Sequence, residues 1–280
     1  MTYNSVKISG IGIGQDSIKG TLRFLKKITA DENPKSSVRL SPDTELEKFR
    51  AAAAEAKKQL LALKEETSAL AGEKEAGIFG IHAMLTDDED FKSAAENLIT
   101  QGLPAHEAVI RAGEVVAEAI KGLDDEYLSG RADDVKDVAA RISRVITGHS
   151  ELEAPSDDNP YILAAENLTP GETVQLDRSK LLGFVTSGGS PNSHTAILAR
   201  ALGIPALVNV GQLDKDFDGK DVILDAGRGE LIVEPDISEL ERFASEAREK
   251  ELRRELLRGL VGRKTATKSG RAVRLYANVG

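Results

Sequence analysis

A long helical stretch in the middle of the chain most limits what the chain can fold into. Residues 43–146 are rich in Ala, Leu, Glu and Lys, and their apolar residues recur at the spacing of a helix face. Residues 5–30 and 161–233 have instead the short apolar runs and glycine turns that are typical of strands. The sequence therefore predicts an α/β domain plus an all-α part, an antiparallel helical bundle inserted between two portions of the α/β domain.

Turn and cap residues divide these stretches into elements. The expected bundle helices span residues 43–71, 73–85, 86–100, 105–121 and 124–146. The expected strands span residues 21–28, 161–165, 181–186, 206–210, 222–225 and 231–233, with a short helix at 170–175. A last helix is expected at 235–258, with Leu240, Phe243, Ala247 and Leu252 on one side, followed by a strand at 272–280.

The glycines at positions 10, 12 and 14 invite a nucleotide-binding interpretation. A lone Gly-x-Gly is weak evidence, and no helix opens after it as a dinucleotide-binding loop would require. Glycines in a turn between strands are the better account of this segment.

Charge and composition exclude several functions. The net charge is −9, which argues against nonspecific binding to nucleic acid or to an anionic membrane and favours a basic partner. The chain has no Cys, so it forms no disulfide and no zinc–cysteine site, and its four His make a His-rich metal site improbable. No apolar run reaches the roughly 18 residues of a membrane span, and no secretory signal is present, so we expect a cytoplasmic protein.

His194 follows a glycine-rich turn and opens a predicted helix. Ser193 is a good N-cap residue, and Gly203 is a typical glycine for the other end of the helix. His194 would then take the first helical position, where unpaired N–H groups and the helix dipole favour an anion. An imidazole that carries a phosphoryl group would suit this place. A histidine that merely neighbours the cap is the alternative.

Several segments resemble those of enzyme I, the phosphoenolpyruvate (PEP)–protein phosphotransferase of bacterial sugar uptake. Residues 193–200 (SHTAILAR) with 203–206 (GIPA) resemble its phosphohistidine signature. Residues 165–173 resemble the strand and turn before that site, and residues 78–85 and 124–128 resemble the carrier-binding helices. The resemblance implies a swivelling β/α phosphohistidine domain with an inserted helical bundle.

The same resemblance implies a domain organisation and a phosphoryl relay. The phosphohistidine domain would comprise residues 1–30 and 150–235, the inserted HPr-binding domain 38–149, a connecting helix 236–262, and the start of a truncated PEP-binding barrel 263–280. His194 would accept the phosphoryl group from PEP, bound by the missing barrel, and pass it to the phosphocarrier protein HPr. We expect this chain alone to be monomeric, to lack Mg²⁺ and to be unable to use PEP, whereas the intact family protein is a Mg²⁺-dependent homodimer.

Site residues are carried over from the family position by position. Phosphorylation would fall on Nε2 of His194, with the Thr173 hydroxyl near the ring, although Thr173 could equally be only a helix-start hydroxyl. The family usually reads Gly-Gly-Arg-Thr-Ser-His, whereas this chain has Ser, Pro and Asn at positions 190–192. The expected phosphoryl-holding turn comprises Gly189, Ser190, Asn192, Ser193 and Thr195. Arg200 should form a salt bridge rather than a phosphate contact.

The HPr-binding surface is expected near the end of the second bundle helix. Met and Leu rimmed by carboxylates make a docking patch for a basic partner. The residues assigned to it are His82, Met84, Leu85, Asp87, Asp88 and Arg131. His82 has a stronger alternative as a packed or interfacial histidine, and His106 and His149 are expected to be dipole or cap residues.

Three other classes of protein are alternative interpretations of the sequence. One is the phosphohistidine domain of a pyruvate, phosphate dikinase or PEP synthase, which would lack the HPr-docking bundle. Another is a non-catalytic helical interaction module on an α/β scaffold. A third is a regulatory paralogue of enzyme I serving nitrogen metabolism, which usually adds an N-terminal sensory domain.

Overall fold

The computed structural model describes residues 5–25, 40–122, 126–148, 159–262 and 265–274, without the side chains of 126–130. Its contacts define two compact units, residues 5–234 and a second unit that begins at Pro235. The sequence also predicts polar linkers at 31–37 and 154–160. The first linker, residues 154–158 of the second, His149, and residues 124–125 and 275–280 lie outside these ranges. No helix in the described ranges is long and apolar enough to cross a membrane.

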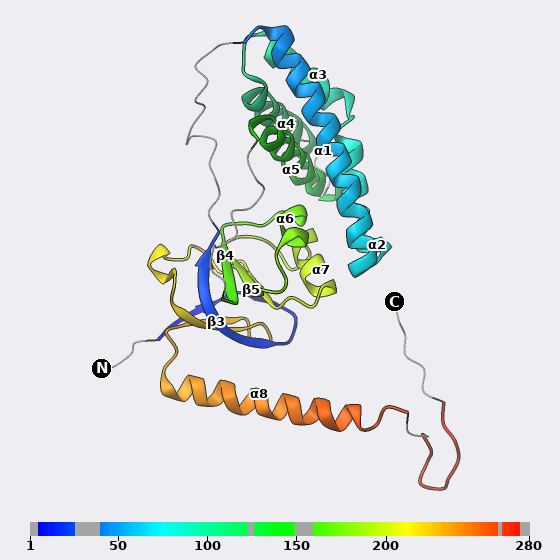
Figure 1. Ribbon diagram of the computed structural model, residues 1–280, viewed down its shortest axis with the longest axis vertical. Helices are drawn as coiled ribbons and strands as arrows, with labels where there is room; N and C mark the ends of the chain where they lie inside the picture. The colour runs from blue at the N-terminus through cyan, green and yellow to red at the C-terminus, as the bar shows by residue number, and fades with distance from the viewer. Residues whose placement is uncertain (1–4, 26–39, 123–125, 149–158, 263–264, 275–280) are drawn as a thin grey trace. The chain divides into compact units, whose positions relative to one another are not determined.

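The first unit is built on one mixed sheet (Figure 1). Three strands precede the helical stretch and five follow it. They are β1 (Val6–Ser9), β2 (Ile11–Ile13), β3 (Ser17–Phe24), β4 (Tyr161–Ala165), β5 (Leu181–Thr186), β6 (Ala206–Val208), β7 (Asp221–Asp225) and β8 (Glu230–Val233). Their order in the sheet is β1-β8-β7-β3-β4-β5-β6-β2.

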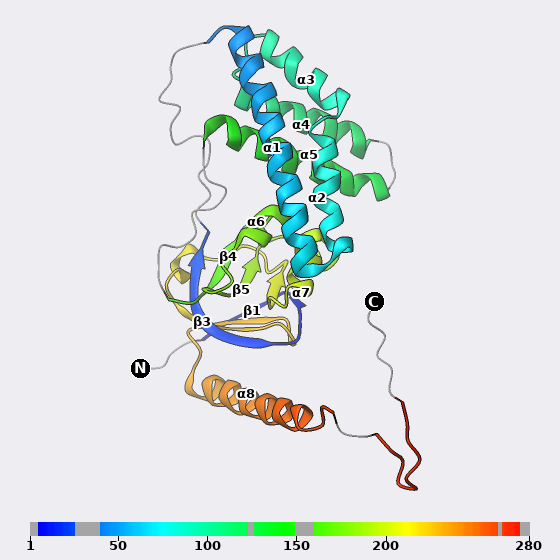
Figure 2. The same ribbon diagram turned by 45° about the vertical axis from the view of Figure 1, so that its right-hand side comes forward.

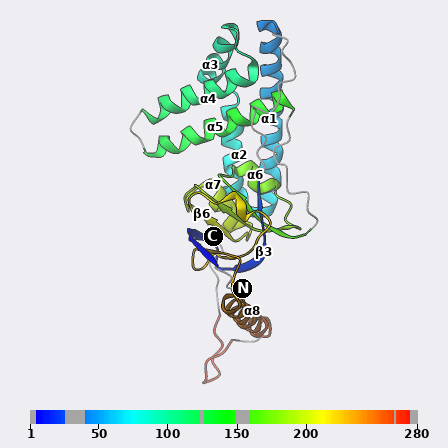
Figure 3. The same cartoon turned by 90° about the vertical axis from the view of Figure 1, so that its left-hand side faces the viewer.

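Helices α1 to α5 leave the sheet after β3 and return to it at β4. Strands β3 and β4 are parallel neighbours, with Thr21 opposite Tyr161. The helices are α1 (Pro42–Ala71), α2 (Glu73–Leu85), α3 (Glu89–Thr100), α4 (Ala105–Lys121) and α5 (Glu126–Thr147). Figure 3 shows α4 and α5 side by side. Helices α1 to α5 thus lie in the chain between two portions that contribute strands to one sheet.

Sequence-local signals set the helix ends. Ser41 caps α1 and Asp88 caps α3 through side-chain acceptors, and Gly72 separates α1 from α2 with a positive φ of 106°. Apolar faces of α1, α3, α4 and α5 form the bundle core around Phe49 and Phe91. These caps and faces explain why the predicted helix boundaries agree with the structure within a few residues.

The sheet curls on itself because its two edge strands are adjacent in the chain. Only Gly10 separates β1, which pairs with β8, from β2, which pairs with β6. The Gly10 N–H donates to the carbonyl of Gly229 at 2.9 Å. The turn predicted around Gly10 is thus the place where the chain changes pairing partners. Side chains of β4 pack alternately into two apolar cores, Tyr161 and Leu163 on one face and Ile162 on the other.

A substitution at Gly12 tests whether the sheet curls tightly at this point. A Cβ on Gly12 would collide with the backbone carbonyl of Ala226, which cannot rotate away. We expect Gly12→Ala to lower the free energy of unfolding by about 2 kcal/mol. The control is Gly77→Ala in α2, where a Cβ meets nothing within 4 Å, so this variant should be neutral or slightly stabilising. Urea unfolding of both variants measures the difference, and equal midpoints would contradict the account.

Two predicted strands have wrong boundaries. The strand expected at 21–28 is β3, which begins at Ser17 because residues 17–21 pair antiparallel with β7, a partner that is distant in sequence. The strand expected at 206–210 stops at Val208. Asn209 adopts a left-handed φ of 58°, and its N–H donates to Gly188 of the glycine-rich turn instead of continuing the strand.

The second unit contains α8 (Ile237–Arg258), which begins with a capping box between Asp236 and Glu239. Of the residues predicted to share one side of this helix, Leu240 and Phe243 are half-buried, whereas Ala247 and Leu252 are exposed. The strand expected from residue 272 is also not formed by the part described, because a tight turn at 267–270 leaves one isolated bridge, between Ala266 and Ala272.

Candidate functional site

His194 is the first residue of α7 (His194–Ala201). The Ser193 hydroxyl caps this helix by accepting the Ala196 N–H at 3.2 Å, as predicted. The N–H groups of His194 and Thr195 have no hydrogen-bond partner within the described ranges. The His194 side chain is 48% exposed. The site thus combines an accessible imidazole with unpaired donors at the positive end of a helix.

The glycine-rich turn before α7 is anchored at its start and open at its end. The Gly188 N–H donates to Glu166, and its carbonyl accepts from Asn209. Gly189 has a φ of 101°, a conformation that favours glycine. Beyond it, the N–H of Ser193 donates to the carbonyl of Ser190 at 3.1 Å. The N–H groups at 189, 190 and 192 therefore have no partner among the described residues.

Two threonines nominated from sequence have other hydrogen bonds. The Thr195 hydroxyl donates to the Leu168 carbonyl at 2.7 Å and holds α7 against the loop before α6 (Pro170–Gln175). The buried Thr173 hydroxyl donates to the Thr169 carbonyl at 2.8 Å. No hydrogen bond joins Thr173 to His194 in the part of the chain that the structure describes. The Thr195 backbone N–H, rather than its hydroxyl, is the group left for an anion.

The closest charged neighbour of His194 comes from the bundle. Oδ1 of Asp134, on α5, lies 3.7 Å from Nδ1 of His194 and 3.2 Å from Nε2 of His82, on α2. The Asp134 side chain is 10% exposed. Sequence reasoning did not find Asp134. The signal that could have revealed it is an acidic residue one position before the buried Val135 of an amphipathic helix.

Asp134 belongs to a charged stripe along α5. Asp137, Arg141 and Arg144 follow it at helical spacing, toward α6. Arg144 forms an ion pair with the buried Glu172 of α6, at 3.3 Å. Burial, with smaller contributions from Glu172 and Asp134, raises the pKa of Asp137 to about 6. This stripe faces α6 and α7, whereas the opposite side of α5 packs in the bundle core.

The raised pKa of Asp137 makes stability depend on pH. The folded protein favours the protonated acid, so the stabilisation is full below the ordinary pKa of 3.8 and is lost as pH rises through about 6. Between pH ~5 and ~8, wild type should lose about 1 kcal/mol more unfolding free energy than Asp137→Asn. Urea unfolding at both pH values measures this difference. An identical pH response in the two proteins would contradict the assigned cause.

Apolar contacts accompany the polar ones between the bundle and the α/β part. Leu60 and Leu63 of α1 and Phe79 of α2 pack with Val174 of α6 and Leu198 of α7. Figure 2 shows the ends of α1 and α2 reaching α6 and α7. His194 therefore lies at the edge of a contact between the two parts.

An open cleft of about 600 Å³ lies beside His194, between α2 and α7. His194, Ile197 and Arg200 line it from α7, opposite Lys74 and Ile81 of α2. The guanidinium of Arg200 has no ion pair in the described ranges, so the predicted salt bridge is wrong. Arg200 is exposed at the mouth of this cleft because its side of α7 faces away from the buried Ala196 and Ala199.

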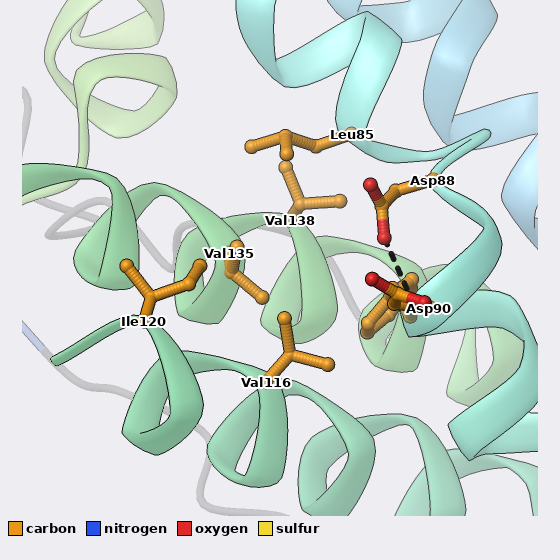
Figure 4. Close-up of a pocket in the computed structure, with 8 residues that line it drawn as sticks. Leu85, Asp88, Asp90, Val116, Ile120, Val135 and Val138 are labelled. Atoms are coloured by element: carbon orange, nitrogen blue, oxygen red, sulfur yellow. Dashed lines mark hydrogen bonds between the residues drawn. The ribbon is translucent and has the colours of Figure 1, made fainter. Parts of the chain in front are cut away.

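A second hollow lies in the bundle, remote from His194 in the chain. It is a groove of about 240 Å³ between α2, α3, α4 and α5 (Figure 4). We call it the bundle groove; its lining residues are Leu85, Asp88, Asp90, Phe91, Val116, Ile120, Val135 and Val138. Of the residues predicted for carrier docking, Leu85 and Asp88 line the groove, and Met84 is 67% exposed.

The other predicted docking residues have different surroundings. His82 is 3% exposed and packs inside the protein, the alternative that the sequence favoured. Asp87 is paired with Lys57 and Lys92, whose hydrogen bonds hold the pKa of its carboxyl below the ordinary value. Asp88 caps α3 through the Phe91 N–H. Arg131 is half-buried on α5. The acidic rim expected around Met84 and Leu85 is thus partly neutralised at Asp87.

No group of three acidic or histidine side chains in the described ranges could hold a metal ion.

Two parts of the chain match families of PEP-utilising enzymes. Residues 8–131 match the family described as "PEP-utilising enzyme, N-terminal", and residues 157–229 match "PEP-utilising enzyme, mobile domain". The second match contains His194 and all of α7. The fold and the accessible imidazole therefore define a protein of the PEP-utilising class.

Curated relatives and solved structures narrow this class to one family. The phosphoenolpyruvate-protein phosphotransferases of Buchnera aphidicola subsp. Schizaphis graminum and Haloferax volcanii are 34% and 32% identical over 98% of this chain. The chain spans about half of their lengths, 48% and 47%. An NMR solution structure of Enzyme I (nEIt) matches with 31% identity and a TM-score of 0.68, covering 87% of this chain and 99% of that one. The chain belongs to the enzyme I family.

A structure of the N-terminal domain of "Enzyme 1 - Nitrogen" is also similar, with 25% identity and a TM-score of 0.58 over 86% of this chain. Both solved structures are therefore similar in fold to this chain.

Proposed function

We propose that His194 is the phosphohistidine of a relay between PEP and the phosphocarrier protein HPr. The observation that carries the proposal is the accessible ring of His194 at the start of α7, beside unpaired N–H groups. Its Nδ1 faces the Asp134 carboxylate, and its Nε2 has no hydrogen-bond partner among the described residues. Nε2 is therefore the nitrogen available for attack on phosphorus.

In the transfer step, the Nε2 lone pair forms a bond to phosphorus while the bond from phosphorus to the donor breaks. The phosphoryl oxygens would then lie near the N–H groups of His194, Thr195 and the preceding turn. Each helix-end donor stabilises an exposed anion by about 0.3–1 kcal/mol. This modest hold suits a group that must leave again. The substitutions at 190–192 retain the N–H groups of Ser190 and Asn192, whereas Pro191 supplies none.

Thr173 is proposed to contact the ring in an arrangement where the bundle has moved away. Its hydroxyl proton is engaged by Thr169, so its oxygen could only accept a hydrogen bond, from Nδ1–H of His194. The phosphohistidine part, residues 1–30 and 150–235, would swivel relative to the inserted part, residues 38–149, so that His194 can face each partner in turn. The ion pair between Arg144 and Glu172 and the small apolar contact would be exchanged in that motion.

The bundle groove is proposed to receive HPr. Leu85, Val116 and Val138 offer an apolar floor, and exposed Met84 lies on the adjoining end of α2. A net charge of −9 favours approach of a basic partner over long range. Asp87 is already paired with two lysines, so we attribute the free energy of HPr binding mainly to burial of apolar surface. The net charge of the chain would act mainly on the rate of association with HPr.

Transfer of radiolabelled phosphoryl tests the proposal. We expect phospho-HPr to label the chain with an acid-labile phosphoryl group, and the transfer to be reversible. A dikinase-type domain or a non-catalytic helical module would gain no label from phospho-HPr. Absence of labelling by phospho-HPr would contradict the proposed relay.

A further inference from the structure

We propose that Asp134 is a positioning residue that holds His194 in the tautomer with the proton on Nδ1. This inference rests on the proposed function and adds a residue to it. Asp134 lies in the inserted bundle, whereas His194 lies in the α/β part, so the nucleophile of one part would be prepared by a carboxylate of the other. The contact exists only while the bundle and α7 are together.

The geometry places two imidazoles on one carboxylate oxygen. Oδ1 of Asp134 lies 3.2 Å from Nε2 of His82 and 3.7 Å from Nδ1 of His194. An ionised carboxylate only accepts, and each of its oxygens has two lone-pair sites. A ring nitrogen that hydrogen-bonds to Asp134 must therefore carry a proton, as Nε2 of His82 does at 3.2 Å and as Nδ1 of His194 would after a closer approach. The half-exposed His194 ring needs a small movement to shorten its contact to a hydrogen bond, as is common before a substrate is bound.

The burial of Asp134 favours a function beyond packing. A carboxylate held away from water is costly unless it is paired and hydrogen-bonded. His82 alone, itself buried, would satisfy a structural acid at this position. The second contact runs instead to an accessible ring on another part of the fold. The neighbouring Val135 and Val138 line the bundle groove, so the turn of α5 that would meet HPr also carries the positioning carboxylate.

The chemical consequence concerns the proton on the ring. With the proton on Nδ1, the Nε2 lone pair is free to form the bond to phosphorus as the donor bond breaks, and no proton has to leave the ring. In the opposite tautomer Nε2 carries the proton and cannot attack until it is removed. Asp134 thus favours the reactive form, in the manner of the aspartate that orients the histidine of a Ser-His-Asp triad.

The test combines nitrogen NMR of the His194 ring with transfer kinetics. In the unphosphorylated ¹⁵N-labelled wild-type chain, at a pH about two units above the ordinary imidazole pKa of ~6.5, we expect the Nδ1–H tautomer. Asp134→Asn presents an amide N–H that favours an unprotonated Nδ1, so the ring should shift to Nε2–H. Uptake of phosphoryl from phospho-HPr should fall by roughly 100-fold or more.

Asp133→Asn is the matched control. It is the same substitution on the same helix, one residue away, at a side chain that is 77% exposed and paired only loosely with Lys121. It should leave the His194 tautomer and the uptake rate unchanged. If the Asp133→Asn chain folds but the Asp134→Asn chain does not, the proposal can still be tested, because the tautomer of His194 can be measured in the wild-type chain alone.

The outcomes separate this inference from the relay itself. A wild-type ring in the Nε2–H form overturns the positioning role, and so does an Asp134→Asn chain that keeps the Nδ1–H form and the wild-type rate. Wild-type chain that takes no phosphoryl from phospho-HPr would overturn the proposed function instead. Normal wild-type transfer with a shifted tautomer and slowed uptake in Asp134→Asn supports both.

Discussion

A His194→Gln chain is expected to take up no phosphoryl group from phospho-HPr above the background of the assay. Glutamine keeps a polar side chain of similar reach, but its amide nitrogen has no lone pair that can attack phosphorus and form a transferable intermediate. His194 is accessible, and its side chain forms no ion pair or hydrogen bond in the described ranges apart from the contact with Asp134, so the substitution should leave the fold intact. Labelling with radioactive phospho-HPr, followed by electrophoresis, measures the loss directly.

His106→Gln provides the same substitution at a position outside the site. His106 lies on α4, where its carbonyl accepts from Ser143 and its ring approaches Glu107. Because glutamine retains that carbonyl, the control should be labelled within about twofold of wild type. Equal labelling of the His194 and His106 variants would remove His194 from the relay.

Val116→Lys is expected to weaken binding of HPr by roughly 100-fold. The change places an ammonium group in the apolar bundle groove, where its desolvation costs a few kcal/mol, and adds a charge of the same sign as the basic partner that we propose. Titration calorimetry or chemical-shift titration with HPr gives the ratio of dissociation constants.

The adjacent Val115→Lys separates the groove from the surface charge. Val115 is 58% exposed and does not line the groove, yet the substitution changes the net charge by the same amount. Its affinity for HPr should remain within a few-fold of wild type. If the two variants lost the same affinity for HPr, the cause would be long-range charge repulsion, and the proposal that HPr docks at the groove would be wrong. Thermal unfolding checks that Val116→Lys is folded.

Local chemistry explains the part of the fold that the sequence could predict. The ends of α1, α3 and α7 follow from the side chains of Ser41, Asp88 and Ser193, which satisfy N–H groups of the first turn. Apolar periodicity within each helix also depends only on neighbours in the chain. The start of α7, and with it the place of His194, was therefore predictable without any tertiary contact.

Contacts between distant segments explain the rest. The start of β3 depends on β7, and the end of β6 depends on the bond from Asn209 to Gly188. Asp134 is separated from His194 by the whole α5–β4 connection, and helical spacing alone makes the charged stripe of α5 look like a solvated face. Only packing against α6 and α7 distinguishes that stripe from an ordinary surface.

Contacts between distant segments also decide the surroundings of the predicted docking residues. The acidic residues at 87–89 predicted a negatively charged surface beside Met84 and Leu85. Lys57 of α1 and Lys92 of α3 instead form ion pairs with Asp87 and neutralise its charge. His82 lies within the carrier-binding segment, yet its ring is turned toward Asp134. These residues are neighbours in the sequence, but their surroundings differ in the fold. Leu85 and Asp88 line the groove, whereas His82 and Asp87 form ion pairs elsewhere.

Tandem mass spectrometry of the wild-type chain after incubation with phospho-HPr tests the central claim most directly, under alkaline conditions that preserve phosphohistidine. The account predicts a single phosphoryl group on the peptide that contains His194, absent when phospho-HPr is omitted. A phosphoryl group located on His82, His106 or any other residue, with the His194 peptide unmodified, would contradict it.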